Sequence, residues 1–210
     1  MQAYSMSFWQ LLMAAGPMIW PIVLCSVVCV AVAIERIAYF SSIRLDTQQF
    51  TARVLDQIRR HQTKEALQIC DTTRHPLSHI FKAGILKYDR PRSQIKEAME
   101  DASLYAIPFL EKNLPVLATA AQIAPLLGLL GTATGLVRCF GAIAAKSAAF
   151  SSVSVADLAG GIWEGLLTAV AGLVVAIPAF VAYNFFVSRV NGVILEMEKS
   201  SAELVNSLTE

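Results

Sequence analysis

The stretch from residue 156 to 187 most constrains the fold, because it is apolar enough to cross a bilayer and yet contains a carboxylate. It reads ADLAGGIWEGLLTAVAGLVVAIPAFVAYNFFV, and Glu164 lies well inside the apolar run. A spanning helix needs about 20 apolar residues, and a charge within it is costly. Thr168 follows four residues later, on the same helical face as Glu164. This polar stripe must face other helices or water, because lipid would not accept it.

The composition agrees with a membrane protein that has a modest aqueous portion. Hydrophobic residues make up 55% of the chain and charged residues 16%, whereas soluble domains carry about 25% charge. The net charge of +1 gives no indication of the strong positive potential that binds nucleic acid. The four cysteines follow neither a disulfide framework nor zinc spacing, so we interpret them as free thiols and expect no cofactor.

Two further apolar runs precede this stretch, so the sequence predicts an all-α integral membrane protein. We place its three transmembrane helices at residues 17–40, 116–145 and 156–188. Lys and Arg are absent before residue 36 and frequent after it, and positive residues favour the cytoplasmic side. We therefore expect residues 1–16 and 146–155 to lie outside, residues 41–115 to form a cytoplasmic helical domain, and residues 189–210 to form a cytoplasmic C-terminal helix.

The cytoplasmic segment is expected to consist of helices that extend from the membrane. Apolar residues recur at helical spacing over residues 47–61, Thr63 is a candidate N-cap of a short second helix, and a third is expected over residues 77–88. No glycine-rich linker separates the long helix that follows from the second span. We expect that helix to continue into the membrane, with kinks near Pro108 and Pro115.

Small and polar residues mark the second and third spans. Gly128, Gly131 and Gly135 lie close to one helical face, and with Gly172 of the third span they are expected to let membrane helices pack closely. Thr132 lies among these glycines. Its hydroxyl either bonds a carbonyl one turn back or faces a pore.

Two arginines have open interpretations. Arg138 either snorkels to the outer headgroups or pairs with Asp157 in the next segment. Arg36 directly follows Glu35, so this pair either contacts a pore or lies at the membrane interface with Arg36 snorkelling.

One chain has too few helices to enclose a polar stripe, whereas several copies around an axis would shelter it. A ring of Glu164 carboxylates would attract cations, which suits proton handling better than catalysis. The alternative is that Glu164 and Thr168 serve as hydrogen-bonding and packing residues at a helix interface. Known enzyme motifs are absent, and His75 with His79 does not make a metal site, so we expect no enzyme activity.

Two segments resemble a known family. APLLGLLGTATGL, from residue 124 to 136, and GIWEGLLTAVAGLVVAIPAFVAYN, from 161 to 184, are similar to the MotA/TolQ/ExbB proton channel family. The run at residues 16–40 resembles the short ExbB-type members, so the resemblance covers nearly the whole chain. It implies a pentamer in the bacterial inner membrane, with the N-terminus periplasmic and the C-terminus cytoplasmic.

The resemblance also implies a partner and a mechanism. A small single-span protein of ExbD or TolR type would bring a transmembrane aspartate that carries the proton. The complex would work with a TonB- or TolA-like protein to energise outer-membrane transport or envelope processes. Two alternatives are a non-conducting pentameric scaffold for a membrane partner and a small-molecule transporter.

The same resemblance implies a set of pore-lining residues. Thr132 falls on the family's pore threonine, and Glu164 falls on its glutamate. The family's second pore threonine usually stands five residues after that glutamate. Here this position is Ala169, and the hydroxyl is one residue earlier at Thr168. A shift of one residue rotates a side chain by about 100° around a helix. Either the helix adjusts locally, so that Thr168 also lines the pathway, or Glu164 and Thr132 supply more of its polarity.

Overall fold

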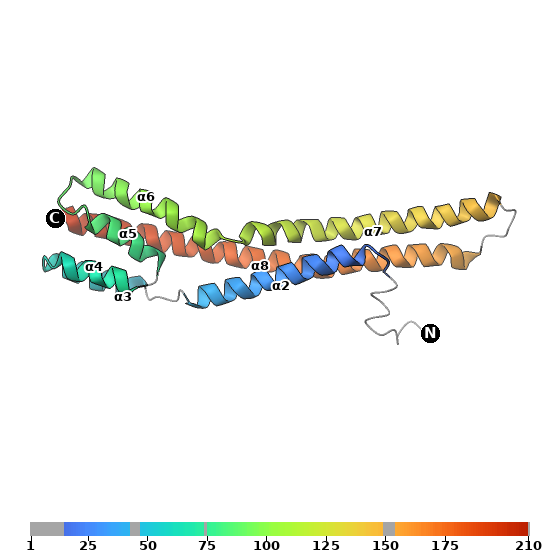
Figure 1. Ribbon diagram of the computed structural model, residues 1–210, viewed down its shortest axis with the longest axis horizontal. Coiled ribbons are helices and arrows are strands. Elements are labelled where there is room, and N and C mark those ends of the chain that lie inside the picture. The colour runs from blue at the N-terminus through green and yellow to red at the C-terminus, as the bar shows by residue number, and fades with distance from the viewer. Residues whose placement is uncertain (1–14, 43–46, 74, 149–153, 210) are drawn as a thin grey trace. The chain divides into compact units, whose positions relative to one another are not determined.

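The computed structural model describes residues 15–42, 47–73, 75–148 and 154–209, which are almost entirely helical and contain no strand. The described helices are α2 (Ile19–Ser42), α3 (Thr47–Arg59), α4 (Thr63–Thr72), α5 (Pro76–Ile85), α6 (Arg92–Glu111), α7 (Leu114–Ala148) and α8 (Val155–Thr209) (Figure 1). They form two compact units. The first unit comprises residues 1–34 and 113–184, and the second comprises residues 35–112 and 185–210.

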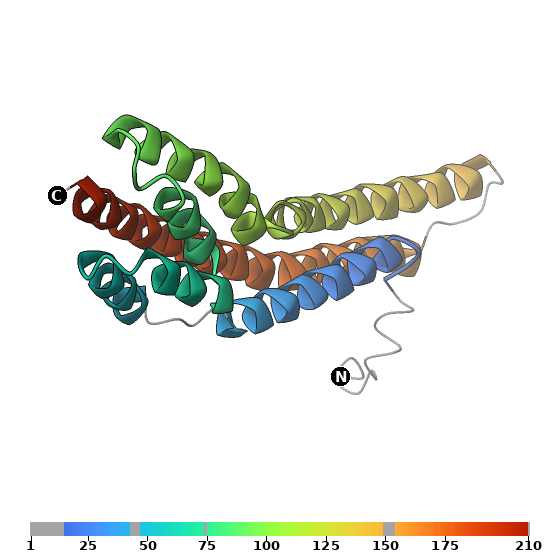
Figure 2. The same ribbon diagram turned by 60° about the vertical axis from the view of Figure 1, so that its left-hand side comes forward.

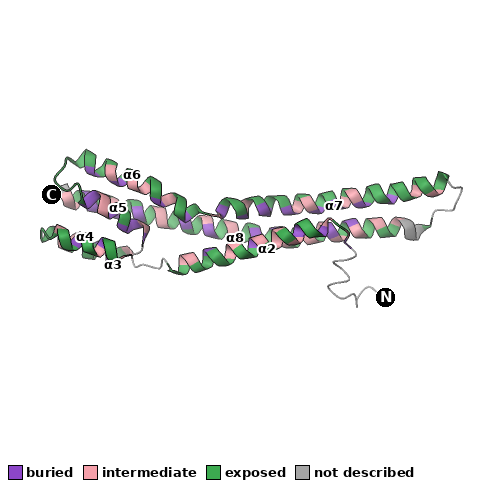
Figure 3. Ribbon diagram, viewed as in Figure 1, coloured by how far each residue is buried: buried purple, intermediate pink, exposed green. Residues whose placement is uncertain are grey.

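Three of the described helices are long and apolar enough to cross a membrane, and they involve α2, α7 and α8. Many of their large apolar side chains are exposed in the isolated chain, as the outer faces of these helices in Figure 3 show. Such a surface is unstable in water but is the surface that lipid or neighbouring helices cover. The predicted all-α membrane class is therefore confirmed.

In the first unit, α7 and α8 run side by side (Figure 1). The buried residues of α7 recur every three or four positions, as the 3.6-residue period of a helix requires for a single packed face. Pro125 lies inside α7 and Pro178 inside α8, and neither ends its helix. Proline is tolerated within membrane helices because neighbouring groups can satisfy the backbone that it frees.

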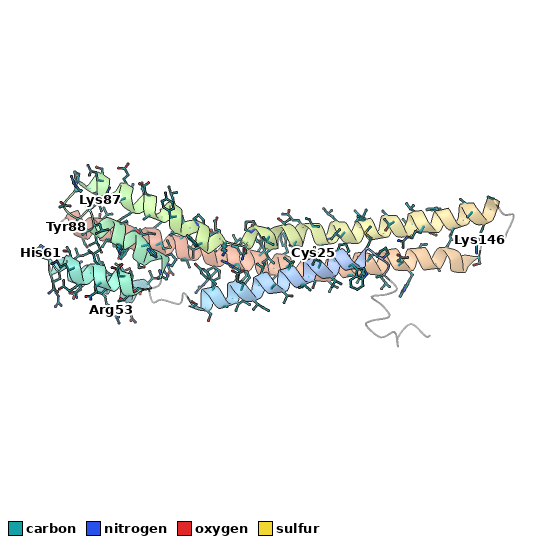
Figure 4. All side chains as sticks on the ribbon, in the orientation of Figure 1. Cys25, Arg53, His61, Lys87, Tyr88 and Lys146 are labelled. Carbon is teal, nitrogen blue, oxygen red and sulfur yellow. The ribbon has the colours of Figure 1, made fainter. Side chains whose placement is uncertain are left out.

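The second unit packs α3 to α6 with the last part of α8 around an apolar core (Figure 2). Phe50 of α3 lies against Phe81 of α5, with ring centroids 5.5 Å apart, and Phe186 of α8 stacks on Phe40 of α2 at 6.1 Å. His61 has a φ of 57° in the turn that joins α3 to α4 (Figure 4). The two aromatic contacts help to hold together short amphipathic helices, each of which would be only marginally stable alone.

The boundary between α6 and α7 differs from the prediction of one continuous helix. α6 ends at Glu111, Asn113 adopts a φ of 62°, and α7 begins at Leu114. A left-handed asparagine is a common helix terminator. Pro115 then lies in the first turn of α7, where a missing N–H costs nothing. Pro108 remains inside α6.

The start of α4 also differs from the prediction. The N-cap is Gln62, without a side-chain cap, and Thr63 is already helical. Thr63 therefore does not cap the helix that it begins. An N-cap residue has non-helical backbone angles, and here it is Gln62 that has them.

Arg36 is buried in the second unit, with 1% of its surface exposed. Its Nη1 donates to the carbonyl of Leu110 at 3.3 Å and its Nη2 donates to Glu35 at 3.0 Å. Its guanidinium also lies 5.0 Å from the ring centroid of Tyr39. The last four carbonyls of a helix lack intrahelical partners, and Arg36 satisfies one of them at the end of α6. Of the two interpretations of the Glu35–Arg36 pair, the one in which Arg36 snorkels to headgroups is wrong, because the guanidinium is buried.

Candidate functional site

The two helices that carry the predicted pore residues meet along a glycine seam, which we define as the contact between α7 and α8 at their glycines. A Cβ added at Gly135 would lie 2.6 Å from the carbonyl oxygen of Gly161, and one added at Gly128 would lie 3.1 Å from that of Thr168. Real Cβ atoms essentially never lie as close as the contact at Gly135, and the contact at Gly128 is tighter than most, so a larger residue at either position needs a shift in the neighbouring backbone. The predicted glycines on this seam are Gly128, Gly131, Gly135 and Gly172.

Two further seam residues, Gly161 and Gly165, escaped the sequence analysis. A Cβ at Gly165 would lie 2.9 Å from the Cα of Thr132, and one at Gly161 would lie 2.8 Å from the carbonyl oxygen of Gly135. Their spacing of four residues places them on one helical face, and this spacing was the signal that could have found them.

Thr132 bridges the seam. Its hydroxyl is within hydrogen-bond distance of two carbonyl acceptors, that of Gly165 in α8 at 3.1 Å and that of Gly128 in its own helix at 3.2 Å. The side chain is half-buried. The hydroxyl therefore bonds one turn back, as one of the two interpretations proposed, and it also holds α7 to α8.

Thr168 lies inside the seam, where it is almost completely buried. Its hydroxyl donates within α8, to the carbonyls of Glu164 at 2.8 Å and Gly165 at 3.0 Å. It packs on Gly131, where an added Cβ would lie 2.5 Å from Thr168 Oγ1. The residue after it, Ala169, lies against Gly128. In the single chain, therefore, Thr168 faces α7.

Glu164 forms an ion pair with Arg138, at a distance of 2.5 Å between Oε1 and Nη1. The two residues are 26 positions apart and belong to α8 and α7. The structure thus pairs Arg138 with Glu164, a contact that neither interpretation of Arg138 named. The Asp157 side chain lies outside the described residues.

Gly16 lies close to the same carboxylate. It has a φ of 71°, and a Cβ at this position would overlap Glu164 Oε1. The turn before α2 therefore brings its backbone against Glu164. Sequence reasoning missed this contact, although the Gly16-Pro17 dipeptide is a recognised turn signal.

The residues next to the ion pair in the sequence include exposed apolar side chains. Arg138 is 52% exposed and Glu164 25% exposed, while their neighbours Val137, Phe140 and Trp163 are also exposed. Lipid suits the apolar neighbours but not the charged pair, which is costly within a bilayer. The pair must therefore be covered by something other than acyl chains.

The two histidines do not come together as metal ligands. His75 is the N-cap of α5, and its Nδ1 accepts a hydrogen bond from the Leu77 backbone N–H at 3.2 Å. His79 is exposed on that helix. Among the residues that the structure describes, no group of three or more His, Cys, Asp or Glu side chains is placed to bind a metal.

The fold and site together define a multi-span α-helical membrane protein with a charged pair across two closely packed spans. The chain belongs to the MotA/TolQ/ExbB proton channel family, which it matches over residues 72–199. This range includes α7, most of α8 and the ion pair between them.

Individual relatives support the same family. The Synechocystis sp. protein named ExbB-like 3 is 31% identical over 174 residues, which cover 83% of this chain and 82% of that protein. The Tol-Pal system protein TolQ of Pseudomonas aeruginosa is 36% identical over 124 residues, covering 54% of this chain and 52% of TolQ. The biopolymer transport protein ExbB of Xanthomonas campestris is 42% identical over 134 residues, covering 63% of this chain and 51% of ExbB.

Proposed function

We propose that the chain is the oligomeric subunit of a proton-driven motor in the bacterial inner membrane. The observation that carries this proposal is the partly exposed Glu164–Arg138 ion pair, which joins two spans that also expose many large apolar side chains. One chain cannot cover it, but copies arranged around an axis cover it without exposing charge to lipid. Membership of a proton channel family supports the same assembly, for which we propose five copies.

The proposed proton pathway passes the level of Thr132, Glu164 and Thr168. Thr132 and Glu164 are partly exposed, whereas Thr168 is buried. A single-span partner of ExbD or TolR type would occupy the central passage and bring the aspartate that carries the proton. The subunit then supplies a polar wall, and the work goes to a TonB- or TolA-like protein for outer-membrane transport or envelope processes.

The proposed orientation places the N-terminus in the periplasm and the C-terminus in the cytoplasm. The second unit, which carries most of the basic residues, would then lie on the cytoplasmic side, as the positive-inside rule requires.

The test is proton uptake into vesicles that contain the chain together with a single-span partner. Glu164→Gln and, separately, Thr132→Ala should each lower partner-dependent uptake while the oligomer stays intact by native mass spectrometry. Glu203→Gln makes the same chemical change at an exposed position of the second unit and should leave uptake unchanged. Unchanged uptake in both of the first two variants would end the proton proposal.

A non-conducting scaffold is the second candidate, and one observation favours it. The Glu164 carboxylate is paired and both threonine hydroxyls are hydrogen-bonded, so these three side chains already have polar partners within the single chain. A scaffold would retain the partner in pull-down experiments for every variant and would take up no protons with or without it.

A further inference from the structure

We propose that Arg138 is the specificity-determining residue that keeps metal cations from binding the Glu164 carboxylates. This inference rests on the assembly proposed above, in which several copies bring their Glu164 side chains around one passage. The geometric basis lies within one subunit. There the guanidinium of Arg138 already pairs with the Glu164 carboxylate that a metal ion would otherwise bind.

The geometry places the cation directly on the carboxylate. Arg138 Nη1 lies 2.5 Å from Glu164 Oε1, so the two groups form a charge-assisted hydrogen bond. The backbone at Gly16 presses on the same carboxylate, where even a Cβ would overlap it. The guanidinium therefore contacts the carboxylate and the backbone at Gly16 lies close to it, while 25% of the Glu164 side chain stays exposed.

Arg138 also changes the net charge of the ring of Glu164 carboxylates, and so changes which ions the ring attracts. A ring of unpaired carboxylates concentrates cations, and its field is stronger where water is excluded. With Arg138 present, each subunit contributes a neutral pair to the ring. Between residues 113 and 184 the sequence has two Lys or Arg residues, Arg138 and Lys146, so removal of Arg138 takes away the cation that is paired with Glu164.

Ligand chemistry points the same way. Na⁺ and other hard cations bind where oxygen ligands replace their hydration shell, and Glu164 Oε1 is such a ligand. Arg138 donates to that oxygen, and a guanidinium keeps its charge over the whole physiological pH range. A proton carried on a neutral carboxylic acid of a partner needs no such oxygen ligands, so Arg138 discriminates against metal ions without blocking that mode of transfer.

A purely packing role does not explain the residue. Arg138 is half-exposed on a helix whose neighbours Val137 and Phe140 are apolar, and a neutral side chain would suit that surface better. A charged side chain is costly next to lipid, and pairing with Glu164 lowers that cost.

The experiment measures Na⁺ binding through thermal stability, so it does not require a conducting partner. The purified full chain in nanodiscs is melted in NaCl and in N-methylglucamine chloride of equal concentration. Arg138→Met, which keeps a long side chain without the charge, should melt several degrees higher in NaCl, because a ligand that binds the folded state raises its stability. Arg138→Gln should behave alike, and the wild type and Arg138→Lys should show no such difference.

The double variant Arg138→Met with Glu164→Gln provides the matched control and should lose the Na⁺ response. The proposal is overturned if neither neutral variant responds to Na⁺, if the double variant still responds, or if neither neutral variant assembles, since a specificity role does not need the charge for assembly. Failure of the proposed function is separate, because it appears as unchanged proton uptake in Glu164→Gln.

Discussion

Gly172 of α8 lies so close to α7 that a Cβ atom added to it would be 2.6 Å from the carbonyl oxygen of Ala124. This oxygen belongs to the backbone of α7, which cannot move out of the way as a flexible side chain can. Gly172→Ala should therefore force the helices apart and destabilise the protein by about 1–3 kcal/mol, the usual cost of overpacking. Thermal unfolding in nanodiscs measures this loss.

Gly141 provides the matched control, because an added Cβ there meets nothing within 4 Å. Gly141→Ala makes the same change in α7 and should be neutral or should stabilise the helix by up to about 1 kcal/mol. Equal effects at the two positions would show that the glycine seam does not govern the packing of α7 on α8.

The two threonines should differ when each loses only its hydroxyl. Thr132 donates across the seam to Gly165, whereas Thr168 donates within its own helix. Thr132→Val should lower stability by about 0.5–1.5 kcal/mol and lower partner-dependent proton uptake. Thr168→Val should cause a smaller loss of both. Uptake that falls further in Thr168→Val would mean that the helix rotates in the assembly.

Arg36 should be essential for the end of α6. Arg36→Met leaves the Leu110 carbonyl buried without this donor, and such a loss costs about 1–3 kcal/mol. The midpoint of thermal unfolding should fall. Arg53→Met is the control, because Arg53 is exposed on α3 (Figure 4), and its midpoint should not change. Equal midpoints for the two variants would contradict the capping role.

The second unit should lose stability in mild acid through His75. Burial lowers the pKa of His75 below its ordinary value, against a smaller opposing effect of Glu196. The folded state thus prefers the neutral imidazole, which accepts the Leu77 N–H. Its contribution is present above the unfolded pKa of about 6.5 and is lost as pH falls through the lower folded value.

His75→Asn tests this directly, because asparagine is a good N-cap that does not titrate. The midpoint of thermal unfolding of this variant should not fall between about pH 7 and about pH 5, two values that lie on either side of the ordinary histidine pKa of about 6.5. His79→Asn, at an exposed position of the same helix, should retain the wild-type acid response. An unchanged acid response in His75→Asn would assign the loss to another group.

The membrane class of the fold could be predicted because lipid leaves few choices. An apolar run of sufficient length must be helical, and glycines at helical spacing indicate where two helices approach. The start of α7 could not be predicted in this way. Pro108 and Pro115 look alike in the sequence, yet one remains inside α6 and the other begins α7, because the left-handed backbone of Asn113 separates them.

The partners of the arginines depended on packing that no local pattern encodes. The pairing of Arg138 with Glu164 depends on the register of α7 against α8, which the sequence alone does not give. Arg36 is buried because the end of α6 offers it a carbonyl, 74 residues further along the chain. Long polar side chains find such partners only once the helices are packed.

The central claim is that the Glu164–Arg138 pair is sheltered by neighbouring subunits around a common axis. The most direct measurement is a cryo-electron microscopy structure of the assembled protein in lipid nanodiscs. Our account predicts a closed ring of five copies in which this pair faces the central passage. A ring in which the pair points outward to acyl chains, or a protein that remains a single copy in the bilayer, would contradict it.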